Sequence, residues 1–212
     1  RRRHDRAVRE LRKALAVELD DADEERMEAT VALTSSLLEL GRLEEAEAAL
    51  EPCAGRPAAA AVEGRILARK GLAALALDRF EVALTQPPGN ADTALRLDAA
   101  TSALDAGDPA HAQRLIDGIA DDPKVQATRG RIALAAGDAL TARALLGSAL
   151  DARPDDSVAL AAAGWACLQL EDHKGATERF HQLMTVTEAN AEALEGLGAC
   201  HAAAGEWGTA RR

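Results

Sequence analysis

The feature that most constrains the fold of this 212-residue chain is a repeated pair of small residues. A glycine is followed five residues later by an alanine, as in the segments LGRLEEA and AGDALTA. The pair recurs in register six times, once with glutamate in place of glycine: Gly41/Ala46, Gly71/Ala76, Gly107/Ala112, Gly137/Ala142, Glu171/Ala176 and Gly205/Ala210. Successive pairs lie 30, 36, 30, 34 and 34 residues apart. Such a period is typical of repeat proteins in which each copy forms one supersecondary unit.

Each copy predicts two antiparallel helices joined by a tight turn. An apolar-periodic segment, VQATRGRIALAA, precedes Gly137, which supplies the left-handed conformation that ends a helix. Asp138 then caps the next helix, and Pro109 directly after Asp108 is a favoured start for another. The second helix of each copy has one apolar face: Ala46–Leu50–Cys53, Ala76–Phe80–Ala83, Ala112–Ile116–Ile119, Ala142–Leu146–Ala149 and Ala176–Phe180–Leu183. Pro88 and Pro154 interrupt the chain before the next copy.

Composition agrees with an all-α fold. Aromatic residues make up only 2% of the chain, and segments such as LAALAL are rich in alanine and leucine. Both are strong helix formers, whereas aromatic and β-branched residues favour strands. Cys53, Cys167 and Cys200 are scattered at small-residue core positions and suit neither zinc nor a disulfide framework. We therefore expect buried, reduced thiols and a reducing, cytoplasmic compartment.

The chain resembles the tetratricopeptide repeat (TPR) family, whose 34-residue pattern has a small residue at position eight and alanine at position twenty. Position eight reads Thr34, Gly64, Ala100, Gly130, Gly164 and Gly198 in successive copies. The resemblance extends over nearly the whole chain, because Ala7, Leu11 and Ala14 match the second helix of a preceding copy. The units at 27–56 and 93–122 are four residues short, and the family's aromatic residues at positions four and eleven are absent. The resemblance implies an α-solenoid of stacked antiparallel helix hairpins, wound as a right-handed superhelix.

The predicted domain organisation follows this register. Residues 1–26 are the second helix of a truncated preceding repeat plus a linker, and residues 191–212 are a first helix and a truncated second helix. Between them lie repeats at 27–56, 57–90, 93–122, 123–156 and 157–190, and all together form one solenoid domain. First helices are expected near 27–40, 57–70, 93–106, 123–136, 157–170 and 191–204. Second helices are expected near 3–19, 43–54, 73–86, 109–121, 139–152 and 173–186, with at most a thirteenth, shortened helix at the end.

In the family, first helices line the concave surface, so the resemblance implies a scaffold that binds a peptide or helix of another protein there. The expected groove residues are Arg65, Leu97, Asp98, Thr101, Thr128, Arg131, Trp165 and Leu168. Arginine and tryptophan are the residue types most often found as binding hot spots, and an acidic or amphipathic segment is the expected guest. The Lys/Asn clamp with which some members grip chaperone tails has no match at positions five and nine, which read Val31/Ser35 and Ala61/Arg65 in the first two repeats.

Other function classes find little support. The net charge of −10 opposes nucleic-acid binding, because neutralising phosphates requires clustered Lys and Arg. The basic segment RRRHDRAVRE is followed by a strongly acidic one, which favours a solvated helix face. No apolar run is long enough for a membrane helix. No motif for a catalytic site, a cofactor or a metal is present, so we expect no enzyme activity, no cofactor and no metal.

Three alternatives to the groove-binding scaffold remain open. A self-assembly module that forms homo-oligomers through repeat stacking is the first, because the chain starts without Met, ends in TARR and is expected to be a piece cut through a hairpin at both ends. RNA binding by helical repeats that read one base per unit is the second. An enzyme whose catalytic domain lies outside these residues is the third.

Overall fold

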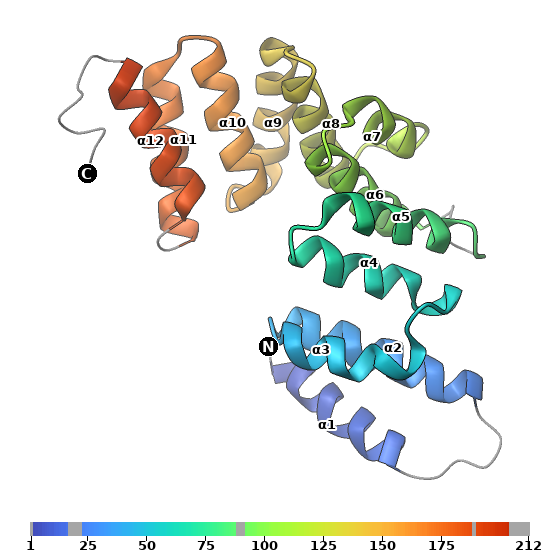
Figure 1. The fold of residues 1–212 in the computed structure, drawn as a ribbon. Coiled ribbons are helices and arrows are strands. Elements are labelled where there is room, and N and C mark those ends of the chain that lie inside the picture. The colour runs from blue at the N-terminus through green and yellow to red at the C-terminus, as the bar shows by residue number, and fades with distance from the viewer. Residues whose placement is uncertain (1, 17–22, 88–91, 188–189, 204–212) are drawn as a thin grey trace. The chain divides into compact units, whose positions relative to one another are not determined.

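The computed structural model describes residues 2–16, 23–87, 92–187 and 190–203, and its helices are labelled in Figure 1. Within these ranges there are twelve α-helices, two short 3-10 helices and no strand. Their bounds are α1 Arg2–Ala16, α2 Asp23–Glu39, α3 Leu43–Leu50, η1 Glu51–Cys53, η2 Pro57–Ala59, α4 Ala60–Arg69, α5 Ala73–Leu84, α6 Thr93–Asp105, α7 Pro109–Ile116, α8 Pro123–Ala135, α9 Ala139–Ala152, α10 Ser157–Gln169, α11 His173–Val186 and α12 Ala191–Ala203. The predicted all-α fold is confirmed.

The helix ranges predicted from the repeat agree closely with these bounds. The largest differences are at α2, which begins at Asp23 rather than near residue 27, and at α7, which ends at Ile116 rather than near residue 121. The predicted helix at 43–54 is an α-helix followed by one 3-10 turn, with Pro52 inside that turn. The expected shortened thirteenth helix falls on residues 204–212, which lie outside the described residues.

The chain divides into two compact units, residues 1–107 and residues 108–212. The first unit contains α1 to α6, and the second contains α7 to α12. In the first, α1 packs on α2, and the pairs α2–α3 and α4–α5 form hairpins. In the second, α8–α9 and α10–α11 form hairpins, and α12 packs on α11. The division falls at the turn inside the predicted 93–122 repeat, and a continuous solenoid stays a prediction.

The turn and capping chemistry explains why the helices begin and end where they do. Gly137 has a φ of 83°, and Glu171 is the only non-glycine residue in the described ranges with a positive φ, at 58°. The Asp138 carboxylate accepts a hydrogen bond from the backbone N–H of Thr141 at 3.1 Å, which confirms the predicted cap. Asp108 caps α7 in the same way, with Pro109 in the first turn. Sequence reasoning missed the further caps, which are Asp92, Asp122, Asp156, Asp172 and Asn190.

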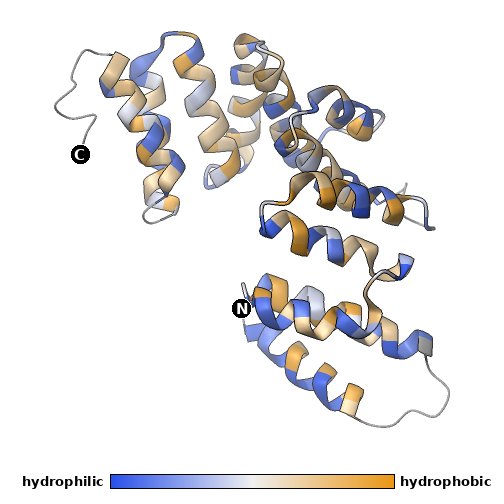
Figure 2. Ribbon diagram, in the orientation of Figure 1, coloured by the Kyte–Doolittle hydropathy of each residue, from blue (hydrophilic) through white to orange (hydrophobic). Residues whose placement is uncertain are grey.

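The core of each unit contains the predicted faces of the second helices together with buried residues of the first helices, such as Leu37 and Leu160. All fifteen residues of the five predicted trios are buried. Figure 2 shows polar and apolar residues alternating along the helices of both units, as expected of amphipathic helices. In α1, however, the predicted residues form only part of the packed face. Val8 is buried and Leu11 and Leu15 pack against the core, whereas Ala14 is exposed. The larger side chains occupy the interface with α2, because they bury more apolar area than alanine does.

Candidate functional site

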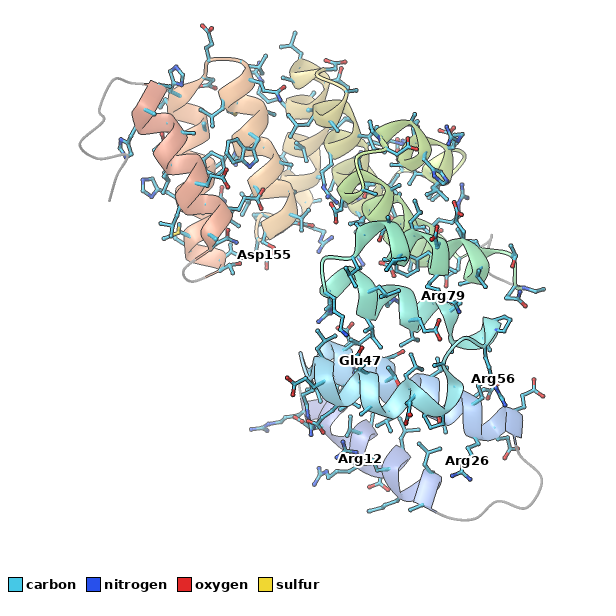
Figure 3. All side chains as sticks on the ribbon, viewed as in Figure 1. Arg12, Arg26, Glu47, Arg56, Arg79 and Asp155 are labelled. Atoms are coloured by element: carbon cyan, nitrogen blue, oxygen red, sulfur yellow. The ribbon has the colours of Figure 1, made fainter. Side chains whose placement is uncertain are left out.

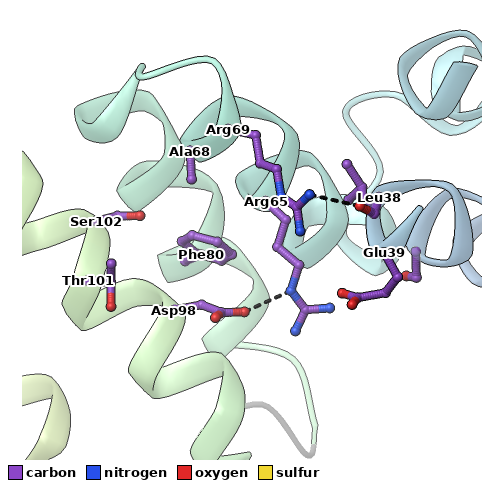
Figure 4. A pocket seen from close by; sticks show the side chains of 10 residues that line it. Leu38, Glu39, Arg65, Ala68, Arg69, Phe80, Asp98, Thr101 and Ser102 are labelled. Atoms are coloured by element: carbon purple, nitrogen blue, oxygen red, sulfur yellow. Dashed lines mark hydrogen bonds and ion pairs between the residues drawn. The ribbon is translucent and has the colours of Figure 1, made fainter. Parts of the chain in front are cut away.

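A pocket of about 240 Å³ opens among the first helices of the first unit. We call it the first-helix pocket, and Figure 4 shows it from close by. Its lining residues are Ser35, Leu38 and Glu39 of α2, Arg65, Ala68 and Arg69 of α4, Phe80 of α5, and Asp98, Thr101 and Ser102 of α6.

The repeat explains why these residues meet. Ser35, Arg65 and Thr101 all occupy position nine of their repeats. The residues three and four positions later in α4, Ala68 and Arg69, also line the pocket. On a helix such residues lie on one face, so three successive first helices present the same face to one opening. The geometry supplies a polar rim around the aromatic ring of Phe80.

The charges in the first-helix pocket balance one another in number, and one pair of them is in direct contact. The Nε of Arg65 donates to the Oδ2 of Asp98 at 2.7 Å, which links α4 to α6. The Nη1 of Arg69 donates to the backbone carbonyl of Leu38 at 2.8 Å. With Glu39, the lining contains two guanidinium groups and two carboxylates. The pocket is therefore nearly neutral, and the structure shows no purely cationic surface at Arg65.

Three of the expected groove residues, Arg65, Asp98 and Thr101, line this one pocket. Leu97 is half-buried on α6 and is not among the lining residues. Sequence reasoning missed Ser35, Glu39 and Arg69 as members of the site. The signal that finds them is the repeat itself, since Ser35 shares its repeat position with Arg65, and Arg69 lies one helical turn after Arg65.

The other four expected groove residues belong to the second unit. Trp165 on α10 is half-buried, with its ring edge-on to Phe180 at 5.3 Å between centroids and 72° between planes. Its Nε1 donates to the Oε1 of Glu192 on α12 at 3.1 Å. Leu168 is half-buried and packs against the core of this unit. An indole held by a neighbouring ring and a carboxylate is a rigid surface feature.

Thr128 and Arg131 lie on α8 and differ in exposure. Thr128 is only 7% exposed, and its hydroxyl donates to the carbonyl of Lys124 at 3.0 Å. Arg131 is half-buried. Thr128 therefore belongs to the packed part of α8 and offers little surface to a guest.

The described residues contain neither a candidate metal site nor a candidate membrane-spanning helix. Across residues 2–16, 23–87, 92–187 and 190–203, no group of His, Cys, Asp and Glu is placed to hold a metal ion. None of the helices in those ranges has the length and apolar content that a membrane span requires. The arrangement at the first-helix pocket is suited to hydrogen bonding and packing.

Comparison with known proteins bears on the fold. Neither the protein-family models nor the curated proteins contain a match to this chain. A tetratricopeptide repeat protein from Parabacteroides merdae is 14% identical over 98% of this chain and 82% of its own, with a TM-score of 0.70. A chain of the APC/C hetero-tetramer Cut9–Hcn1 is 16% identical over 98% of this chain and 42% of its own, with a TM-score of 0.76. YrrB, described as a TPR protein with an unusual peptide-binding site, is 21% identical over 87% of this chain and 95% of its own, with a TM-score of 0.52. This chain has the helical repeat fold of the tetratricopeptide repeat proteins.

Proposed function

We propose that this protein is a non-catalytic scaffold that binds a peptide or helix of another protein along its first helices. The observation that supports this most directly is the first-helix pocket. Three successive first helices contribute equivalent repeat positions to it, so an extended guest meets the same kind of surface at each step.

The chemistry of the pocket favours a guest of mixed polarity. The bond between Arg65 and Asp98 uses the Nε of Arg65, and Glu39 also lines the pocket beside this guanidinium in Figure 4. Arg65 and the two carboxylates thus offer both donors and acceptors, which is what a peptide backbone requires. A purely acidic guest would meet Glu39 and Asp98 as well as the arginines, so we propose a less acidic guest than the sequence suggested.

Two of the structural neighbours support this proposal. YrrB is described as having a peptide-binding site, and the Cut9–Hcn1 structure is a hetero-tetramer.

In the second unit, Trp165 supplies a rigid aromatic surface on a first helix, of the kind often found at binding hot spots.

Site-specific photo-crosslinking tests the proposal. A photoreactive benzoylphenylalanine is placed at Ser35 or Thr101 in the pocket, and at the exposed second-helix positions Ala74 and Glu178 as matched controls. We expect the pocket positions to capture a distinct protein in cells of the source organism and the control positions to capture none. Equal capture at all four positions would contradict a groove-specific interaction.

The same experiment distinguishes the scaffold proposal from the alternative of self-assembly. If the captured protein is a second copy of this chain, and light scattering shows a mass that rises with concentration, homo-oligomerisation replaces the scaffold proposal. Once a partner is known, Trp165→Ala should weaken its binding by about 2 kcal/mol, as for a hot spot. Far-UV circular dichroism of the variant must match that of the parent, because Trp165 also packs on Phe180.

A further inference from the structure

A second and larger cavity, of about 730 Å³, lies in the first unit between α1 and the α2–α3 hairpin. It differs from the first-helix pocket in every lining residue. We call it the α1–α3 cavity. Its lining residues are Arg12, Leu15 and Ala16 of α1, Arg26, Met27, Thr30 and Leu33 of α2, Ala48 and Ala49 of α3, Pro52 and Cys53 of η1, and Arg56.

The α1–α3 cavity combines an apolar floor with a cationic rim. Leu15, Met27 and Leu33 supply the apolar floor, where Leu33 is buried and the other two are half-buried. The charged members of the described lining are Arg12, Arg26 and Arg56, which Figure 3 labels. No carboxylate is among the described lining residues. In a chain of net charge −10, this cavity therefore has the opposite sign to the whole.

Among the described residues, few carboxylates neutralise these arginines. Arg12 donates to Glu45 at 2.7 Å, but Glu45 also accepts two hydrogen bonds from Arg42, both at 2.6 Å. Arg26 and Arg56 form no ion pair with any residue that the structure describes. The Nη1 of Arg56 lies 3.9 Å from the sulfur of Met27, which places this guanidinium beside the apolar floor.

Two other arginines of the first unit that bridge helices have carboxylate partners. Arg65 pairs with Asp98, and Arg79 pairs with Glu63 at 2.5 Å. Arg26 and Arg56 at the α1–α3 cavity differ from Arg65 and Arg79, because no carboxylate of the described residues pairs with them. A guest with several carboxylates and an apolar face would satisfy both the rim and the floor.

We propose that the α1–α3 cavity binds an acidic amphipathic segment of a partner protein. Apolar side chains of that segment enter against Leu15, Met27 and Leu33, and its carboxylates accept bidentate hydrogen bonds from Arg26 and Arg56. The arginines of the rim come from separate segments of the chain, so a peptide with several carboxylates can engage more than one of them while its apolar face covers the floor. This surface is separate from the first-helix pocket, and the proposal does not depend on the function proposed for that pocket.

Fluorescence anisotropy with the full chain tests the proposal. The probe is a fluorescein-labelled peptide, EELLEDLLEE, and its twins replace either every acid by its amide or every leucine by serine. We expect the parent probe to bind about tenfold more tightly than either twin, and its affinity to fall as salt is raised from 50 to about 300 mM. Equal binding of the probe and its amide twin would overturn the proposal.

Protein variants assign the binding to the cavity. The double change Arg26→Gln and Arg56→Gln should weaken binding of the probe about tenfold. The matched control is Arg6→Gln with Arg9→Gln, which removes the same charge from exposed positions of α1 outside the cavity. If both doubles weaken binding equally, only the net charge matters and the proposal is wrong. Arg65→Gln should leave binding of this probe unchanged, so that failure at one pocket is distinguishable from failure at the other.

A second pair of variants keeps the arginines in place. Ala48 lines the cavity and is exposed, so Ala48→Glu introduces a competing carboxylate without a buried charge. Ala48→Glu should weaken binding, whereas Ala48→Gln, of the same size, should not.

The segment that joins α1 to α2 in sequence contains Glu18, Asp20 and Asp21. If the probe binds only after these three residues are changed to their amides, the arginines of the cavity bind the chain's own carboxylates. That outcome would contradict the proposal of a partner segment.

Discussion

Glu171 shows how a single residue can depart from a repeat without changing its fold. It occupies the helix-ending position that glycine fills at Gly41, Gly71, Gly107 and Gly137, and its φ of 58° lies in the left-handed region as theirs do. For a residue with a Cβ atom, that conformation costs about 1–2 kcal/mol. The backbone N–H of the next residue, Asp172, still donates to the carbonyl of Cys167 at 2.9 Å, so the turn is preserved at that cost.

Glu171→Gly should therefore stabilise the protein. Relief of the strain is partly offset by the greater freedom of glycine in the unfolded chain, about 0.4–1 kcal/mol, which leaves a net gain of roughly 0.5–1 kcal/mol. Urea titration measures it, with Glu178→Gln on the exposed surface of α11 as a control expected to stay within about 0.5 kcal/mol. A lower urea midpoint for Glu171→Gly would contradict the strain argument.

Cys167 is a buried free thiol whose pKa is raised. Burial is the main cause, because it disfavours the thiolate, and the negative charge of Asp172 adds to it. A raised pKa means that the neutral thiol persists to higher pH in the folded protein than in an exposed peptide. Since the thiolate is the reactive species, Cys167 is protected both by its low exposure and by its protonation.

Alkylation of Cys167 by iodoacetamide at pH 8 should accordingly be slow. We expect a rate at least about tenfold below that of the same protein in denaturing urea, where the thiol recovers its ordinary pKa. Peptide mass spectrometry resolves Cys167 from Cys53 and Cys200, which are also buried. A native rate equal to the denatured rate would show that this thiol is accessible and ionises normally.

The helix hairpin depends on one close crossing between its two helices. A Cβ atom built on Gly64 would lie 2.7 Å from the ring of Phe80, and one on Gly130 would lie 2.6 Å from the Cγ of Leu146. Gly164 faces Phe180 in the same way, at 2.6 Å. In these three hairpins, the glycine at position eight therefore makes room for the large side chain at position twenty-four. From its repeat position we expect Gly198 to lie at such a crossing too, but its partner helix falls on residues 204–212, outside the described residues.

Phe180 is enclosed from both sides, since Gly196 of α12 meets the same ring from the next hairpin. Gly164→Ala should therefore destabilise the protein. Overpacking costs about 1–3 kcal/mol, and the better helix propensity of alanine returns only about 0.8–1 kcal/mol of it. Gly164→Leu should cost more, because a larger side chain would have to fit against a ring that is enclosed on both sides.

The matched control for this prediction is Gly147→Ala on α9. Gly147 is also helical, but nothing lies within 4 Å of a Cβ built on it, so alanine should stabilise by roughly 0.5–1 kcal/mol. Thermal and urea unfolding of the two variants should give shifts of opposite sign. Shifts of the same sign would show that the assigned helix crossing does not control packing.

Across each unit as a whole, contacts connect elements that are close in sequence. In the second unit α8 packs on α9, α9 on α10, α10 on α11 and α11 on α12, and the longer contacts reach only from α10 to α8 and α12. The stability of such a protein is a sum of repeat terms and nearest-neighbour terms, so damage to one hairpin is felt mostly by its neighbours.

Hydrogen exchange of Gly164→Leu tests this. Amide exchange should accelerate most in α9 to α12, by about tenfold or more, and much less in α1 to α5 of the first unit. The control Glu178→Gln changes an exposed side chain without altering the packing of the helices. It should leave the amide exchange rates of all the described helices unchanged. Uniform acceleration throughout the described helices would mean that the chain unfolds as one cooperative body instead.

Sequence was sufficient for the helices, most turns and the buried faces of the second helices, since these depend on local propensity and on a pattern repeated many times. The positive φ at Gly137 and the cap at Asp138 are of this kind. In α1, Leu11 packs against the core as the pattern indicates, but Ala14 is exposed, because Val8 and Leu15 bury more apolar area than alanine does. The prediction for α1 was weaker than the others because α1 is the second helix of a truncated repeat, whose first helix is not part of the pattern.

The sequence by itself also determined that Arg65 and Thr101 share a repeat position, and therefore a helix face. Only the tertiary structure decided that Asp98 neutralises Arg65, that Gly196 closes on Phe180, and that Arg12, Arg26 and Arg56 surround one cavity. The physical reason is that periodicity specifies which way a side chain points from its own helix. Whether it then meets a partner depends on distances between segments about thirty residues apart, and those distances are decided by how neighbouring helices pack.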